Sequence, residues 1–212
     1  MNNLRSRYGS LEDLVDPIHT ALLLVECQNG VIGEKSSFPA LAEASKAIIP
    51  NLGLLAKAAR ESKVRVIHGL AMTRSDGWGA NSNARLFGAA RNSDIQQLPE
   101  TEAVRPVKEI GFDSERDVLL PRLHGLSPTS GTELDSLFRN EEIRTVIVSG
   151  VSLNVAIQNS VFDLINQGYQ VVVPRDAVVG VPVEYGQVVL ENTLAVLATL
   201  TDVESLVNVW SQ

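Results

Sequence analysis

Cysteine and histidine are scarce in this sequence, which has one cysteine, Cys27, and three histidines among 212 residues. A single cysteine cannot form a disulfide within the chain, and no cysteine or histidine spacing matches a zinc site. We therefore expect no metal and no other cofactor. The low cysteine content also favours a reducing, cytoplasmic location.

Basic residues are also few. The chain has 18 lysines and arginines against 25 acidic residues, a formal net charge of −7, and the basic residues form no cluster. This distribution argues against nucleic acid as a partner. No apolar run approaches the ~20 residues that a membrane-spanning helix needs. We therefore expect neither a nucleic acid nor a membrane as a partner.

The composition is that of a folded globular protein. Hydrophobic residues make up 44% of the chain and charged residues 20%, which is too apolar for a disordered segment or a charged coiled coil. A chain of this length that folds as one unit buries about 70% of its unfolded surface. We predict a single domain over residues 18–212, preceded by an N-terminal extension of residues 1–17.

Short apolar runs recur along the chain, and most of them lack polar alternation. Runs of this length that are rich in valine, isoleucine and leucine indicate strands covered on both faces, as in a parallel sheet. The predicted strands cover residues 20–27, 64–68, 117–120, 145–149, 169–173 and 195–200.

Helical spacing of apolar residues between these runs predicts the helices that cover the sheet. Pro50 is expected to kink or divide the first of them, and Gly168 suits a left-handed helix end. The predicted helices cover residues 41–59, 83–90, 132–139, 155–166 and 184–197, and residues 69–116 form a long irregular excursion. The alternation predicts an α/β three-layer sandwich with a mostly parallel six-stranded sheet. Ligands then bind at the carboxyl ends of the strands, where the strand order reverses.

Two charged residues stand at the ends of apolar strands. Glu26 ends the first, where a carboxylate is costly to ionise unless a cation or hydrogen-bond donors meet it. Arg122 follows the third, and its guanidinium matches a carboxylate in geometry. We predict that these two strand ends are neighbours and that the side chains form a buried ion pair. The pair is either a scaffold salt bridge or part of a catalytic or binding site.

A third feature is the turn from Gly150 to Asn154, which leads from a strand into a helix. It places the amides near Ala156 at a helix N-terminus, where an anion or oxyanion can be held. In many α/β proteins such a turn only closes the packing, so both interpretations stay open.

Three segments of the chain resemble the isochorismatase-like hydrolase superfamily, which includes nicotinamidases, carbamoyl amidases and isochorismatases. The resemblance spans residues 18–205 and implies the α/β fold and a homodimer or homotetramer. The segments are residues 21–30 (ALLLVECQNG), residues 120–125 (LPRLHG) followed by residues 131–134 (GTEL), and residues 148–156 (VSGVSLNVA).

The sequence departs from the superfamily at its catalytic positions. The family's aspartate, lysine and nucleophilic cysteine are replaced by Glu26, Arg122 and Ala156. Alanine cannot form an acyl-enzyme, so covalent cysteine catalysis is excluded at this position. Cys27 does not substitute for it, because a neighbour of Glu26 in a strand points to the opposite face of the sheet and is expected to be a buried apolar residue.

Two functions remain in view. Isochorismatases lack the cysteine, and in them the acidic residue protonates a vinyl ether. The chain is then a small-molecule hydrolase with Glu26 as acid or base and Arg122 on an anionic group, which predicts an open cavity. The alternative is an inactive member that binds a small carboxylate or serves as an oligomeric scaffold, which predicts a filled or sealed one. Burial should raise the pKa of Glu26, whereas a nearby Arg122 should lower it. The sequence does not show which of these two effects is larger.

Further residues are expected around the same cavity. His124 is either a ligand contact or structural, whereas His68 is expected to end a strand as a hydrogen-bonded core residue. The metal-binding nicotinamidases carry Asp-x-His after the second strand, but residues 68–73 here read HGLAMT. The candidates for substrate binding are Ser152, Asn154, Gln158, His124, Trp78, Asn81 and Phe87.

Overall fold

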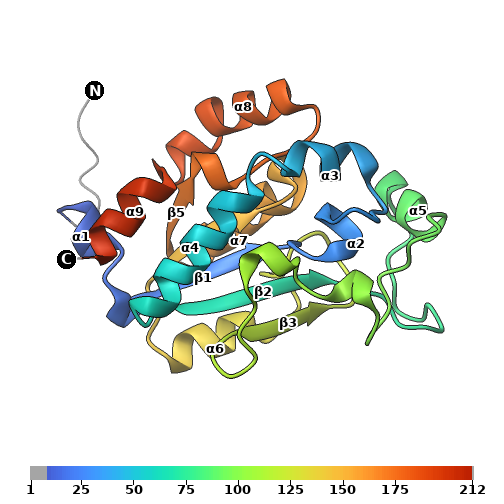
Figure 1. Ribbon diagram of the computed structural model, residues 1–212, viewed down its shortest axis with the longest axis horizontal. Helices are drawn as coiled ribbons and strands as arrows, with labels where there is room; N and C mark the ends of the chain where they lie inside the picture. The colour runs from blue at the N-terminus through green and yellow to red at the C-terminus, as the bar shows by residue number, and fades with distance from the viewer. Residues whose placement is uncertain (1–8, 212) are drawn as a thin grey trace.

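The computed structural model describes residues 9–211, and in that range six parallel strands form one sheet (Figure 1). The strand order is β3-β2-β1-β4-β5-β6. This confirms the predicted fold class. The strands are β1 (Thr20–Val25), β2 (Arg65–Ala71), β3 (Val118–Arg122), β4 (Thr145–Gly150), β5 (Gln170–Pro174) and β6 (Thr199–Thr201).

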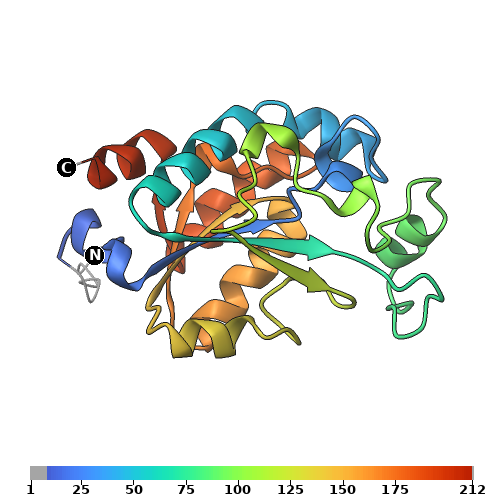
Figure 2. The same ribbon diagram turned by 60° about the horizontal axis from the view of Figure 1, so that its bottom comes forward.

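Helices cover both faces of this sheet and give the molecule three layers (Figure 2). One face packs against α1 (Leu11–Leu14), α2 (Asn29–Ile32), α3 (Pro39–Ser45), α4 (Ile49–Glu61) and α9 (Val203–Trp210). The other packs against α6 (Leu134–Asn140), α7 (Gln158–Asn166) and α8 (Val183–Asn192).

The central strand β1 shows why the sheet is so apolar. Leu22 and Leu24 belong to the core on the α4 side, whereas Leu23 and Val25 belong to the core on the α7 side. All six residues of β1 are buried. Because successive side chains point to opposite faces, a strand covered on both sides must be apolar throughout.

The predicted helix over residues 41–59 is divided. One helix, α3, ends at Ser45, and α4 begins at Ile49 with Pro50 in its first turn, where a missing N–H costs nothing. Gly168 has φ 91° and ends α7 in the left-handed region, as predicted.

The C-terminal boundaries differ from the prediction. The helix predicted over residues 184–197 ends as α8 at Asn192, and the short 3-10 helix η6 (Leu194–Val196) follows it. The strand predicted over residues 195–200 is limited to β6, Thr199–Thr201. Val196 is 78% exposed, so the apolar character of this segment does not mark a buried strand.

A long excursion connects β2 to β3, as the sequence predicts. It contains α5 (Arg85–Arg91) and the 3-10 helices η2 (Glu102–Val104) and η3 (Lys108–Ile110). None of the residues of α5 is buried. Figure 1 shows α5 at the end of the molecule toward which the arrows of β2 and β3 point. The part of the excursion around α5 therefore lies beside the carboxyl ends of the strands, whereas η3 packs against α4.

The predicted N-terminal extension covers residues 1–17, of which residues 1–8 lie outside the described part of the chain. Leu14 and Val15 are buried in the core, and the Trp210 indole N–H donates to the Val15 carbonyl at 2.9 Å. Within residues 9–211, none of the helices has the length and apolar character that crossing a membrane requires.

Candidate functional site

A cavity of about 770 Å³ opens at the carboxyl edge of the sheet. β1 pairs with β2 on one side and with β4 on the other, so the strand order reverses at β1. Doubly wound sheets bind ligands at this point. Glu26, Arg122 and Ala156 all line the cavity.

Glu26 directly follows β1 and leaves the strand conformation. Its φ is 54°, in the left-handed region that residues other than glycine rarely adopt, and its amide donates to the Gly69 carbonyl at 2.8 Å. Such a backbone costs about 1–2 kcal/mol. Strain of this kind is concentrated at functional sites, where the surrounding fold holds it in place.

Glu26 and Arg122 form the ion pair that the sequence predicts. Arg122 Nη2 donates to Glu26 Oε1, and the side chains of Arg122 and Glu26 are 8% and 14% exposed. The strands are not neighbours, however, because β2 lies between β1 and β3. Arg122 stands opposite Ala71 at the end of β2, so its side chain reaches past that strand to Glu26.

The remaining donors of Arg122 are directed at its own loop. Its Nη1 donates to the carbonyls of His124, at 3.2 Å, and Gly125. Its Nε is buried and has no hydrogen-bond partner among the described residues. The loop after β3 therefore fixes the guanidinium, and the guanidinium fixes the carboxyl group of Glu26.

The two opposing effects on Glu26 do not cancel. Burial raises the pKa of Glu26, and the charge and hydrogen bond of Arg122 lower it, with a net pKa above the usual range for a carboxyl. A carboxyl group with a raised pKa holds its proton closer to neutral pH, which suits a general acid.

Ala156 occupies the short π-helix η4 (Leu153–Ile157) that follows β4. The turn before it includes a cis peptide bond between Val151 and Ser152. The Ser152 hydroxyl donates to Asn154 Oδ1 at 2.8 Å, and Asn154 Nδ2 donates to the Val181 carbonyl at 3.2 Å. These contacts fix the turn, and the cavity wall at this point is a methyl group and not a nucleophile.

Cys27 lies away from the cavity, in the core on the α4 side. Its side chain is buried, and its thiol donates to the Val25 carbonyl at 3.4 Å. Burial raises the pKa of the thiol, and the charge of Glu26 raises it further. This agrees with the predicted buried apolar residue, because a thiol held in this way is a poor nucleophile.

Most of the residues predicted to bind substrate line the cavity, namely Ser152, Asn154, His124, Asn81 and Phe87. Trp78 and Gln158 do not line it, and Trp78 is 79% exposed. Asn81 Oδ1 accepts a hydrogen bond from the Gly125 amide at 2.7 Å. Asn81 thus joins the excursion to the loop that holds Arg122.

The sequence does not predict the amide clamp, which we define as Gln28 and Gln97. Gln28 is fully buried, and its Nε2 donates to the Ala71 carbonyl at 2.8 Å and to Gln97 Oε1 at 2.7 Å. Gln97 Nε2 donates in turn to the Gly30 carbonyl at 2.7 Å. Gln97 also lines the cavity. Gln28, two residues after Glu26, therefore holds Gln97 in place in the cavity wall.

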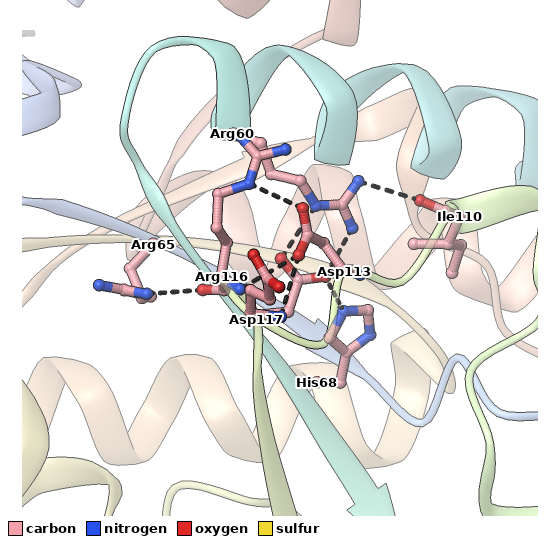
Figure 3. A network of polar contacts seen from close by, with 8 residues as sticks. Arg60, Arg65, His68, Ile110, Asp113, Arg116 and Asp117 are labelled. Carbon is pink, nitrogen blue, oxygen red and sulfur yellow. Dashed lines mark hydrogen bonds and ion pairs between the residues drawn. The ribbon is translucent and has the colours of Figure 1, made fainter.

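His68 is a buried core residue, as predicted, but it lies within β2 and not at its end. Its Nε2 is 3.0 Å from Asp117 Oδ2, which Arg60 Nη2 also contacts at 2.7 Å (Figure 3). Asp113 donates its amide to the same oxygen at 3.1 Å. Neither His68 nor Asp117 lines the cavity. This network joins β2, β3 and α4.

Among residues 9–211, no group of three or more histidine, cysteine, aspartate or glutamate side chains is placed to hold a metal ion. The cavity wall at the end of β2 starts with Ala71, Met72 and Thr73, none of which supplies a carboxylate or imidazole ligand. The carboxylate that follows, Asp76, is paired with Arg74.

Comparisons with known proteins agree with this architecture. The isochorismatase domain model matches residues 20–205, and the comparison with curated proteins gives no match. A cysteine hydrolase from Pseudomonas syringae pv. phaseolicola 1448A is 22% identical, with a TM-score of 0.79 over 93% of this chain and 95% of that one. An isochorismatase family protein from Desulfovibrio vulgaris subsp. vulgaris str. Hildenborough is also 22% identical, with a TM-score of 0.77 over 92% and 99%.

An enzyme of stated activity has the same fold. N-carbamoylsarcosine amidase from Thermoplasma acidophilum is 19% identical, with a TM-score of 0.68 over 87% of this chain and 96% of that one. At this identity the likeness shows the fold, and the chemistry must be argued from the residues of this chain.

Proposed function

This chain belongs to the isochorismatase family, and we propose that it is a hydrolase of small molecules that works without a covalent cysteine intermediate. One observation carries the proposal: the cavity is open, and a carboxyl group with a raised pKa lines it. Ala156 stands at the family's nucleophile position, so the attacking group is water.

The proposed reaction starts with protonated Glu26 as the general acid. For a vinyl ether, the Glu26 proton goes to the terminal alkene carbon, and the positive charge develops on the ether carbon. Water adds to that carbon, and the bond to the ether oxygen breaks. One proton of the added water restores Glu26, and the other goes to the departing ether oxygen, so the products are an alcohol and a carbonyl compound.

Arg122 has a supporting part in this scheme. The sequence assigns it to an anionic group of the substrate, but its Nη atoms already contact Glu26 and the carbonyls of His124 and Gly125. We propose that Arg122 fixes the Glu26 carboxyl group and balances the negative charge that Glu26 carries after it gives up its proton. A guanidinium suits this task because it stays charged at every relevant pH.

The alternative function is an inactive family member that binds a small carboxylate. The contact between Glu26 and Arg122 favours it, because a buried acid–arginine pair can be structural. A sealed cavity would have supported it further, but Glu26 and Arg122 line an open one. The hydrolase is therefore the better supported function.

A substrate screen with the Glu26→Gln variant tests the proposal. Purified protein is assayed against vinyl ethers and small amides, and the substitution should reduce kcat/KM by about 10²- to 10⁴-fold. Glutamine retains an oxygen that can accept from Arg122 but has no acidic proton. Glu26→Asp is the control that keeps the acid. Turnover unchanged by Glu26→Gln, or a trapped thioester, would contradict this mechanism.

Two further predictions come from the sequence. The family resemblance implies a homodimer or homotetramer, and the composition implies a cytoplasmic protein. Light scattering coupled to size-exclusion chromatography measures the mass of the assembly and tests the first.

A further inference from the structure

Five charged side chains line the cavity: Glu26, Arg74, Asp76, Arg91 and Arg122. Four of them contact one another in two acid–arginine pairs, Arg122 with Glu26 and Arg74 with Asp76, the latter at 2.7 Å. Within residues 9–211, no carboxylate forms an ion pair with Arg91, whose Nη2 donates to the Asn81 carbonyl at 3.2 Å. Among the arginines of the lining, Arg91 is therefore the one without a carboxyl partner in residues 9–211.

Arg122 is less suited than Arg91 to bind an anionic ligand. Both of its Nη atoms already donate to oxygens of the protein, and its Nε is buried. The guanidinium of Arg91 has more donors left for a ligand, because within residues 9–211 its one hydrogen bond runs from Nη2 to the Asn81 carbonyl. Arginine binds carboxylate and similar anions through two parallel N–H donors.

The helix α5 gives this guanidinium an apolar setting. Leu86 and Ala90 are four residues apart, as are Phe87 and Arg91, and all four line the cavity. Residues at this spacing share one face of a helix. Because no residue of α5 is buried in the core, packing of the core does not account for its apolar face. These side chains form an apolar part of the cavity wall beside Arg91 instead.

We propose that Arg91 binds the anionic group of the substrate, and that the substrates are apolar monoanions. The apolar body of such a molecule contacts Leu86 and Phe87, and its scissile bond lies toward Glu26. This inference rests on the proposed function in taking the cavity as the substrate site. It adds which residue recognises the anion and which class of molecule fits.

Two dyes that differ by one anionic group test the inference. They are 8-anilinonaphthalene-1-sulfonate and its uncharged counterpart N-phenyl-1-naphthylamine, and fluorescence titration gives the Kd of each. Arg91→Gln should raise the Kd of the sulfonate about tenfold, which is the value of one ion pair in a partly desolvated site. It should change the Kd of the uncharged dye less than about twofold.

Two variants of the same helix serve as controls. Arg85→Gln removes an equal charge from α5 at a position that does not line the cavity, and it should leave both Kd values unchanged. Phe87→Ala should raise the Kd of both dyes, because it removes apolar surface from the cavity wall. Since α5 has no buried residue, the melting temperatures of all three variants should match the wild type.

Several outcomes would overturn the inference. The first is that Arg91→Gln raises the Kd of both dyes by the same factor. The second is that Arg85→Gln raises the Kd of the sulfonate as much as Arg91→Gln does. The others are that Phe87→Ala changes neither Kd, and that the wild type binds neither dye. Dye binding needs no catalysis, so it separates the two proposals. An inactive protein whose sulfonate binding depends on Arg91 refutes only the hydrolase. An active hydrolase indifferent to Arg91 refutes only this inference.

Discussion

Two buried acid–arginine pairs of this molecule have the same chemistry and opposite proton affinities. Asp117 contacts Arg60 with side chains 0% and 8% exposed, and Glu26 contacts Arg122 with side chains 14% and 8% exposed. In both cases burial raises the pKa of the acid. Hydrogen bonds from His68 and Arg60 outweigh burial at Asp117 and hold its pKa well below the usual range, whereas the pKa of Glu26 stays raised.

The number of donors explains the difference. The Asp117 carboxylate accepts from Arg60 Nε and Nη2, from the Asp113 amide and from His68, whereas Glu26 has one contact with Arg122 among the described residues. Hydrogen bonds to the ionised form lower a pKa, and a lone partner does not fully offset desolvation. An arginine nearby is therefore not enough to keep a buried acid ionised. The pair that is short of donors faces the cavity.

The largest expected effect on stability comes from the pair of Asp117 and Arg60, which does not face the cavity. Asp117→Asn leaves Arg60 buried without a charged partner, so we expect the free energy of unfolding to fall by about 3–5 kcal/mol. Urea unfolding measures it. Because Asp117 does not line the cavity, the Kd of N-phenyl-1-naphthylamine should stay unchanged under conditions in which the variant is folded.

An exposed pair provides the control for this substitution. Glu43 contacts Lys46 with side chains 74% and 69% exposed. Glu43→Gln should cost less than about 1 kcal/mol, because water screens exposed charges. Costs of similar size for Asp117→Asn and Glu43→Gln would show that the buried network contributes little, and the contrast between the two buried pairs would fail.

The pH dependence of stability should have opposite signs at the two pairs. The pKa of Asp117 is lower in the folded state than in the unfolded state, so its contribution is complete above about pH 5 and is lost as the pH falls. The pKa of Glu26 is higher in the folded state, so its contribution is complete below about pH 4 and is lost as the pH rises through the folded pKa. Each unit of pKa difference corresponds to about 1.4 kcal/mol.

Urea unfolding of the wild type, Asp117→Asn and Glu26→Gln between about pH 2 and pH 8 separates the two signs. The stability of the wild type minus that of Asp117→Asn should shrink toward acidic pH. The stability of the wild type minus that of Glu26→Gln should shrink toward alkaline pH. Neither replacement titrates, so each difference isolates one carboxyl group. If both stability differences changed in the same direction with pH, the proposed contrast between Asp117 and Glu26 would be wrong.

The sequence predicts the sheet well, since strands buried on both faces must be apolar. At the C-terminus an exposed apolar segment is mistaken for part of a strand. Another error occurs where a polar residue finds a partner distant in sequence. The second strand is predicted to end at His68, but it continues to Ala71, because Asp117 satisfies the imidazole within the sheet. A window of sequence around His68 does not contain Asp117, which is 49 residues away.

The same reason separates the predicted and the missed parts of the site. Glu26 and Arg122 are predicted because both follow strands, and the carboxyl ends of parallel strands lie at one edge of the sheet. Gln28 and Arg91 are missed, because their roles depend on how the long excursion folds back over that edge. Its polar residues give no periodic signal, and nothing local to Gln28 identifies Gln97, which is 69 residues away.

The smallest expected effect concerns the wall beside Glu26. A Cβ on Gly30 would lie 2.4 Å from both terminal atoms of the Gln97 amide. Gly30→Ala should therefore displace Gln97 and cost about 1–3 kcal/mol of unfolding free energy, since it leaves the buried Gln28 amide short of a partner. Gln97→Ala alone should cost a similar amount. Urea unfolding of both single variants and the double variant measures the coupling.

The double variant should be no less stable than Gln97→Ala, because without the glutamine side chain the alanine at position 30 meets no obstacle. Gly88→Ala in α5 is the matched control, since no atom lies within 4 Å of its Cβ position, and it should be neutral or slightly stabilising. Additive losses would mean that Gly30 and Gln97 act separately. The cavity wall beside Glu26 and Arg122 would then be held in place by contacts other than the amide clamp.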